Sequence, residues 1–580
     1  MSDLPQTLST LVLDAASHAL GPDIEVADAM LRPSNDPKFG DYQANLALPL
    51  AKQLKQKPRD LAERIAAALG DADGLLAKPA EVAGPGFINL TLADATLRHA
   101  ATGLNLSGRL GVPADATARH VVVDYCGTNV AKEMLVWHLR STIIGDALVR
   151  VLEALGHRVT RQNHLGDWGT QFGMLIEYLN DLDAPDRIEI GDLNAFYQQA
   201  KQKFDDDPDF VERARERVVA LQQGHPATRA RWRQLVEASV EHFNAVCDRL
   251  GVRLTPDDIR GESFYNDQLE PTVAALDAAG LLRQSEGAQV VYPDGFVNQD
   301  GEPLPMIVRK SDGGFLYATT DLAAARYRID ELKADRVIYV TDARQSPHFA
   351  MVFATLHAAG MAEDIRLEHV PFGTMLGKDR RPYKTRSGES IRLADVLDEA
   401  VRRADAAIAE KNPDLPPEVR QDVAEAVGIG AVKYADLSGD RVKDYVFDYD
   451  RMLSLEGNTA PYLLYSYARI RSIFRKGEID FNDFCGDNVA VAEPAERALV
   501  LHLLRFGETV AAVGETLEPH RLCNYLYDLA TRYHRFFEAC PVLKADDAPT
   551  RDARLALCRL TARTLDTGLG LLGIRVVERM

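Results

Sequence analysis

Four polar side chains lie where an expected strand gives way to an expected helix. Asp124 ends a run of β-branched residues, Asn129 and Lys132 follow in the next eight positions, and His138 lies at the start of an apolar-striped segment. Ligands of parallel α/β sheets bind at the carboxyl ends of strands, beside helix N-termini. This short stretch is therefore the first candidate for a ligand site.

The elements that hold these side chains follow from the apolar pattern. Val121, Val122 and Val123 predict a buried strand, and the stripe that follows predicts a long amphipathic helix. Its members are Leu139, Ile143, Ile144, Ala147, Leu148, Val151, Leu152 and Leu155. Together they predict the first βα unit of a parallel sheet, with further strands at 158–163 and 336–340 and a helix from about His348.

Length and composition restrict the class of protein. A chain of 580 residues with 46% apolar and 26% charged residues predicts three or four globular domains. A net charge of −19 argues against a protein that coats nucleic acid non-specifically, although local basic patches can still bind RNA. The six cysteines are scattered, which disfavours a disulfide framework or a zinc site and favours a reducing cytoplasm.

Neither a targeting segment nor a membrane span is expected. The first 20 residues include Asp3, Asp14 and His18 and lack a basic start followed by an apolar core, so they do not resemble a signal peptide. No run of about 20 apolar residues occurs, so we expect no contact with a membrane.

The N-terminal region, residues 1–110, predicts a small α+β domain. Helices are expected at Leu8–Leu20, Leu46–Leu54 and Pro58–Leu69, the last because proline favours a first helical turn. Glu81–Leu92 predicts a turn followed by a strand, and Phe39–Asn45 predicts a polar, aromatic loop.

The rest of the chain divides by pattern into a sheet domain at 111–400, a helical connector at 401–457 and a helical domain at 458–580. An insertion is expected at about 180–310: Asp181–Leu254 is acidic and helical, with charges that predict a solvated face, and Gly261–Val308 predicts hairpins and turns. His164–Gly173 is expected to be a loop. Gly373–Arg392 is rich in glycine and cations and predicts a mobile loop.

Several motifs resemble those of the class I aminoacyl-tRNA synthetases, in particular the arginyl family, across nearly the whole chain. They are Asn129–Lys132, His138–Thr142, Gln162–Gly173, Asp450–Ser454, Gly457–Tyr462 and Leu555–Arg563. The resemblance implies an α/β fold: a Rossmann-like class I synthetase catalytic domain, a small α+β N-terminal domain that contacts the tRNA elbow, and an all-helical C-terminal anticodon-binding domain.

The resemblance also implies a reaction and its partners. Arginine, ATP with Mg²⁺, and tRNA(Arg) would react to form arginyl-adenylate and then arginyl-tRNA, in a cytoplasmic protein that is a monomer. The two groups that react in the first step, the arginine carboxylate and the α-phosphate of ATP, are both anionic, so catalysis requires positioning and electrostatic stabilisation of the phosphates. The residues expected to stabilise the phosphates are Lys132, His138, Lys378, Lys384 and Arg386.

The arginine pocket requires carboxylates, because a guanidinium is a fixed cation that pairs with them through two hydrogen bonds. By resemblance, Asp124 and Asp321 supply the carboxylates, and Asn129 holds the α-amino group. Asp321 could instead cap the helix that follows it, and the two roles are compatible. The other residues expected to contact arginine are His164, Gln171, Tyr317 and Gln345.

The nucleotide motif departs from the family pattern. Where the family has His-x-Gly-His, this chain has Leu135, Val136, Trp137 and His138, and Thr128 lies in a Cys-Gly-Thr segment where the family is rich in serine. Trp137 is expected to occupy the adenine pocket unless its side chain turns away or stacks on adenine, and Leu135 lacks a donor for the transition state. A weakened or inactive synthetase-like protein that retains tRNA or arginine binding is the alternative function. A nucleotidyltransferase of the same fold is a third.

Overall fold

A computed structural model describes residues 4–21, 24, 26–34, 36–114, 117–182, 193–383 and 391–580. The N-terminal part is the predicted small α+β domain, an antiparallel sheet of order β1-β2-β4-β3 covered by helices. Its elements are α1 (Leu4–Leu20), β1 (Leu31–Pro33), β2 (Tyr42–Ala44), α2 (Ala47–Leu54), α3 (Pro58–Leu69), β3 (Glu81–Ala83) and β4 (Phe87–Leu90). The loop predicted at Phe39–Asn45 is wrong in part, because Tyr42–Ala44 pairs with strands on both sides.

A four-stranded parallel sheet of order β11-β10-β5-β6 forms the centre of the molecule. It confirms the predicted βα unit, since strand β5 is buried along its length and is followed by helix α5. Strand β11 was not predicted from the sequence. The elements are β5 (His120–Asp124), α5 (His138–Ala154), β6 (Arg158–Gln162), β10 (Arg336–Asp342), α12 (Ser346–Ala358) and β11 (Arg366–Phe372).

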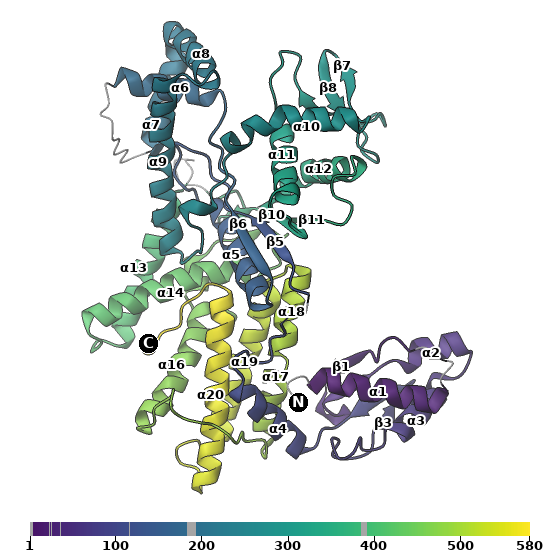
Figure 1. Ribbon diagram of the computed structural model, residues 1–580. Coiled ribbons are helices and arrows are strands. Elements are labelled where there is room, and N and C mark those ends of the chain that lie inside the picture. Colours follow the sequence, from purple (N-terminus) through teal and green to yellow (C-terminus); the bar gives the residue numbers. More distant parts are fainter. Residues whose placement is uncertain are drawn as a thin grey trace.

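Two groups of elements inserted between β6 and β10 lie on opposite sides of the sheet in Figure 1. The first is helical, with α6 (Gln171–Asp181), α7 (Leu193–Asp206), α8 (Pro208–Gln222) and α9 (Pro226–Arg249). The second contains α10 (Asn266–Ala278), the antiparallel sheet β7 (Arg283–Ser285), β8 (Ala288–Val291) and β9 (Met306–Arg309), and α11 (Tyr317–Asp330).

Two predictions for this region need correction. The loop expected at His164–Gly173 ends early, because α6 begins at Gln171. The hairpins expected at 261–308 omit α10, which forms although Pro271 lies inside it. Its buried residues, Leu269, Thr272, Val273 and Leu276, recur at helical spacing and hold the helix against α11.

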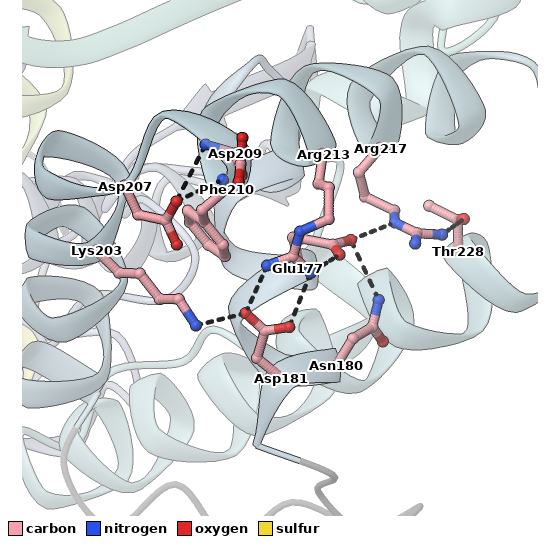
Figure 2. A network of polar contacts seen from close by, with 10 residues as sticks. All are labelled: Glu177, Asn180, Asp181, Lys203, Asp207, Asp209, Phe210, Arg213, Arg217 and Thr228. Atoms are coloured by element: carbon pink, nitrogen blue, oxygen red, sulfur yellow. Dashed lines mark hydrogen bonds and ion pairs between the residues drawn. The ribbon is translucent and has the colours of Figure 1, made fainter.

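Charged residues join the helices of the first group to one another (Figure 2). Glu177 is buried and accepts hydrogen bonds from Arg213 at 2.7 Å and Arg217 at 2.9 Å. Asp181 accepts from the same Arg213 and from Lys203, and these hydrogen bonds lower the pKa of Asp181 to about 2. The members of this network that lie in the predicted acidic segment, Asp181, Lys203, Arg213 and Arg217, are partly exposed, and ion pairs join them to one another and to the buried Glu177.

The C-terminal third is helical, as predicted. The short strands β12 (Met375–Leu376) and β13 (Tyr445–Val446) pair in parallel, and the other elements of this region are helices, several of which pack on α5 (Figure 1). They are α13 (Leu393–Lys411), α14 (Pro417–Leu437), α15 (Tyr449–Met452), α16 (Ala460–Lys476), α17 (Pro494–Leu503), α18 (Phe506–Thr516), α19 (His520–Ala539) and α20 (Ala548–Leu571). Helix α4 (Asp94–Leu106) connects the N-terminal domain to the sheet domain and packs on α17 and α20.

Candidate active site

A cavity of about 630 Å³ opens at the carboxyl ends of β5 and β10. The turn after β5, the first residues of α5, and α11 and α12 form its walls. Six of the seven residues expected to contact arginine line this cavity: Asp124, Asn129, His164, Tyr317, Asp321 and Gln345. Gln171, the first residue of α6, does not line it.

Two carboxylates form the acidic wall of the cavity. Asp321 accepts a hydrogen bond from Nε2 of His348 at 2.6 Å, and the His348 ring lies 4.9 Å from that of Tyr317. Glu262 lies beside it, and burial, together with the nearby charges of Asp167 and Asp321, raises the pKa of Glu262 to about 7. Neither Glu262 nor His348 was identified from the sequence as a site residue, because each follows a segment with no recognisable motif.

Asp124 lies deeper and already has a cationic partner. Its Oδ2 accepts a hydrogen bond from Arg328 at 2.8 Å, and Arg328, which is fully buried, also donates to Gln162. The charge of Asp124 is therefore balanced within the protein, whereas Asp321 and Glu262 have no arginine or lysine partner among the ion pairs of the described residues.

The side chain of Ser141 links helix α5 to strand β10 and to the turn after β5. Its hydroxyl donates to the carbonyl of Val340 at 2.6 Å and accepts from the amide of Cys126 at 2.9 Å. The turn is tight: Cys126 has a φ of 78°, and a Cβ on Gly166 would lie 2.1 Å from Oδ1 of Asn129. Asn129 is thus held against the backbone of the next loop.

His138 and Trp137 also line the cavity, with ring centroids 5.8 Å apart. Burial lowers the pKa of His138 to about 4, so the ring is neutral at pH 7. The amide of Leu135 donates to Nδ1 of His138 at 2.9 Å, which places the ring proton on Nε2. Trp137 is 45% exposed, whereas Thr128, Leu135 and Val136 are buried and do not line the cavity.

The segment that carries the nucleotide motif pairs with the end of the glycine- and cation-rich loop. Val136 donates to the carbonyl of Ile391 at 3.0 Å, and Leu393 donates to that of Met134 at 2.8 Å. The residues before α5 are thus hydrogen-bonded to the chain at the start of α13.

The lysines that were expected to stabilise phosphates and that the structure describes lie away from the cavity. Lys132 lies with its Nζ 4.5 Å from the centre of the Tyr197 ring, and Lys378 pairs with Asp448 and Asp450, so neither lines the cavity. Lys384 and Arg386 lie outside the residues that the structure describes. Of the three expected catalytic residues that the structure describes, His138 alone lines the cavity.

Comparison with known proteins identifies the family. Three family models match successive regions: "Arginyl tRNA synthetase N terminal domain" at residues 6–92, "tRNA synthetases class I (R), catalytic domain" at 102–449 and "DALR anticodon binding domain" at 463–580. The arginine–tRNA ligase of Thermobifida fusca is 52% identical, over 100% of both chains.

Solved structures agree over the same length. The arginyl-tRNA synthetase of Plasmodium falciparum superposes with a TM-score of 0.84 at 29% identity and covers 99% of each chain. That of Thermus thermophilus superposes with a TM-score of 0.81 at 27% identity and covers 100% of each chain. The chain therefore belongs to the arginyl-tRNA synthetase family of class I aminoacyl-tRNA synthetases.

Proposed function

We propose that this protein ligates arginine to tRNA(Arg) in the cavity at the carboxyl ends of β5 and β10. In the first step the arginine carboxylate attacks the α-phosphorus of ATP and pyrophosphate leaves. In the second, a hydroxyl of the terminal ribose of the tRNA attacks the adenylate carbonyl and AMP leaves. The observation that carries the proposal is an acidic cavity, at a strand switch point, in a chain that matches arginine–tRNA ligases over its full length.

The guanidinium is assigned to the wall formed by Asp321 and Glu262. These carboxylates are close enough for their charges to interact, and a guanidinium between them would satisfy both. Tyr317, Gln345 and His164 supply neutral contacts. Asn129 and Asp124 are assigned to the α-amino end, because Asp124 ends β5 and Asn129 lies in the turn that follows.

The phosphates are assigned to the end that holds His138. Its Nε2–H can donate to a phosphate oxygen while the ring stays neutral, so no proton need be gained. Lys132, Lys378, Lys384 and Arg386 remain proposed partners of the phosphates. Among the described residues no cluster of three acidic, histidine or cysteine side chains forms a metal site, so we propose that Mg²⁺ arrives bound to ATP.

We also propose how the domains share the tRNA. Residues 1–110 would contact its elbow and 458–580 its anticodon side, with 401–457 as connector; the boundary at 400 moves to about 392, because α13 spans it. A second cavity, of about 710 Å³, in the helical domain is lined by Arg469, Arg475, Lys476, Lys544 and Arg579, which suits RNA.

No helix in the described ranges has the length and apolar character of a membrane span. We propose that the protein acts as a monomer in the cytoplasm.

Asp321→Asn should reduce the discrimination of arginine from citrulline by about 10- to 100-fold, since a hydrogen bond to a charged group contributes about 1.5–3 kcal/mol. The KM for arginine in tRNA-dependent pyrophosphate exchange, compared with the inhibition constant of citrulline in the same assay, measures this discrimination. Asp342→Asn is the matched control, because Asp342 lines the same cavity but its carboxylate is occupied by Arg344 at 2.8 Å. If the Asp321 variant and the parent discriminate arginine from citrulline equally well, Asp321 does not contact the guanidinium.

Arginine binding should weaken by about 10-fold as the pH falls from 8 to 6. The pKa of Glu262 is raised to about 7, so about nine-tenths of this carboxyl is ionised at pH 8 and about one-tenth at pH 6. A cationic ligand requires the ionised form. Calorimetric titrations with arginine test this, and citrulline, which is neutral, should bind independently of pH. Glu262→Gln should abolish the dependence; if it persists there, another group titrates.

A further inference from the structure

A small cavity lies at the junction of the N-terminal domain and the helical domain. Its volume is about 170 Å³, several times the roughly 30 Å³ of one water molecule. The N-terminal domain contributes Pro33, Ser34, Gly40, Asp41 and Tyr42. The helical domain contributes Ala498, Leu501, His502, Arg505 and Arg532. It is remote from the candidate active site in the sequence and shares no lining residue with it.

Two arginines give this cavity its charge. Arg505 lies between α17 and α18, and Arg532 lies on α19, so different elements bring them together. In each, Nε is buried and has no hydrogen-bond partner among the described residues. Neither guanidinium pairs with a carboxylate of the described residues. A buried N–H without an acceptor costs free energy, so an acceptor from outside the protein would relieve this cost.

The other charged groups nearby do not neutralise these arginines. Asp41 pairs with Arg497, which also donates to Asp94 at 2.6 Å, and Asp41 accepts a hydrogen bond from the amide of Leu92 at 2.7 Å. His502 is buried and its Nε2 donates to the carbonyl of Tyr525 at 2.9 Å. Burial, with the charges of both arginines, lowers the pKa of His502 to about 3, so it adds no positive charge at pH 7.

We propose that Arg505 and Arg532 bind a phosphodiester group of the tRNA backbone at this junction. Guanidinium groups bind phosphate oxygens through paired hydrogen bonds, and two guanidinium groups from different elements would contact one phosphate from two sides. This site rests on the proposed function, since it assumes that tRNA is the ligand.

The location selects RNA as the source of the phosphate. One wall belongs to the region matched by the arginyl N-terminal domain model and the other to the anticodon-binding domain model. An RNA that contacts both domains must cross their junction. In a chain with a net charge of −19, long-range attraction for RNA is weak, so individual phosphate contacts must hold it. A phosphate here would also fix the angle between the two domains.

The test measures tRNA(Arg) affinity against salt concentration for the full-length parent, Arg505→Gln, Arg532→Gln and the double variant. The slope of log affinity against log salt should become shallower by about 1 in the double variant. Arg505→Lys, which keeps the charge, should retain most of the slope. Arg521→Gln is the control, because Arg521 is an exposed arginine of α19 that pairs with Glu518. Thermal melting checks that each variant folds. An unchanged slope in the folded double variant would overturn the proposal.

Ethylation interference identifies the phosphate directly. Ethylation of the contacted phosphate should weaken binding to the parent and have no effect on binding to the double variant; identical patterns for both would contradict the site. Inorganic phosphate, added at constant ionic strength, tests for a free anion. If it raises the melting temperature of the parent but not of the double variant, while the slope of log tRNA affinity against log salt is the same for both proteins, the cavity binds a free anion and the RNA assignment is wrong. A parent that binds no tRNA would instead refute the proposed function.

Discussion

Replacing Arg140 with methionine should lower the free energy of unfolding by about 3–5 kcal/mol, the usual cost of removing one partner of a buried ion pair. Arg140 is fully buried and its Nε donates to Asp436 of α14 at 3.1 Å. It also donates to the carbonyl of Gly373 at 2.6 Å. The substitution leaves the carboxylate of Asp436 buried without a cation and frees the start of α5 from the connector.

The pH dependence distinguishes this cause from a packing defect. Burial raises the pKa of Asp436 above its usual value, and loss of Arg140 would raise it further. A carboxyl whose folded pKa is raised favours the folded state at low pH and loses that contribution as the pH rises through the folded pKa. The loss in free energy of unfolding caused by Arg140→Met should therefore be smaller at pH 5 than at pH 8.

Urea unfolding followed by tryptophan fluorescence is the measurement, because all three tryptophans, Trp137, Trp168 and Trp232, belong to the catalytic domain and its insertion. The control is the double variant Arg140→Met, Asp436→Leu, which replaces the pair by apolar residues and should recover most of the stability. A single variant that loses less than about 1 kcal/mol would show that the pair contributes no more than an exposed one.

The elements that the sequence predicted well are those in which one pattern decides the structure. Helix α3 begins at Pro58 and ends at Leu69 as expected, because proline marks its first turn and five buried residues recur at helical spacing. Strand β5 and helix α5 follow from a run of valines and a long apolar stripe. In each case local pattern and tertiary packing agree.

The elements that were missed depend on partners far away in the chain. Strand β2 is only three residues long and exists because β1 and β4 pair with its edges. Helix α10 contains an internal proline, and only its packing on α11 reveals its helical face. Local propensity does not report such long-range contacts.

The candidate site shows the same division. The residues lining the cavity that were predicted follow recognisable motifs, but Glu262 comes from a 3₁₀ turn with no pattern of its own. The partner of Asp124, Arg328, lies more than 200 residues away in α11. A carboxylate's neighbours decide whether it is free to bind a ligand, and these neighbours become visible only in three dimensions.

The double substitution Leu135→His, Trp137→Gly should raise the rate of arginine- and tRNA(Arg)-dependent pyrophosphate exchange by about 100-fold or more. A donor that acts on the transition state contributes about 3–4 kcal/mol, a factor of about 100–1,000. Trp137 lines the cavity beside His138, so its removal opens space for adenine at the end assigned to the nucleotide. Trp137 is the last residue before α5, where glycine is tolerated.

The single variants separate the two effects. Trp137→Gly should lower the KM for ATP, because it opens space for adenine. Trp137→Phe keeps an aromatic ring and should change the KM for ATP little. Leu135→His should act mainly on kcat, through an imidazole that moves out of the buried position of Leu135 to reach the phosphates. Melting temperatures show whether the polar residue is accepted there. If the parent exchanges pyrophosphate as fast as the double variant, Trp137 turns away from adenine or stacks on it, and the family's His-x-Gly-His pattern is not required for activity in this chain.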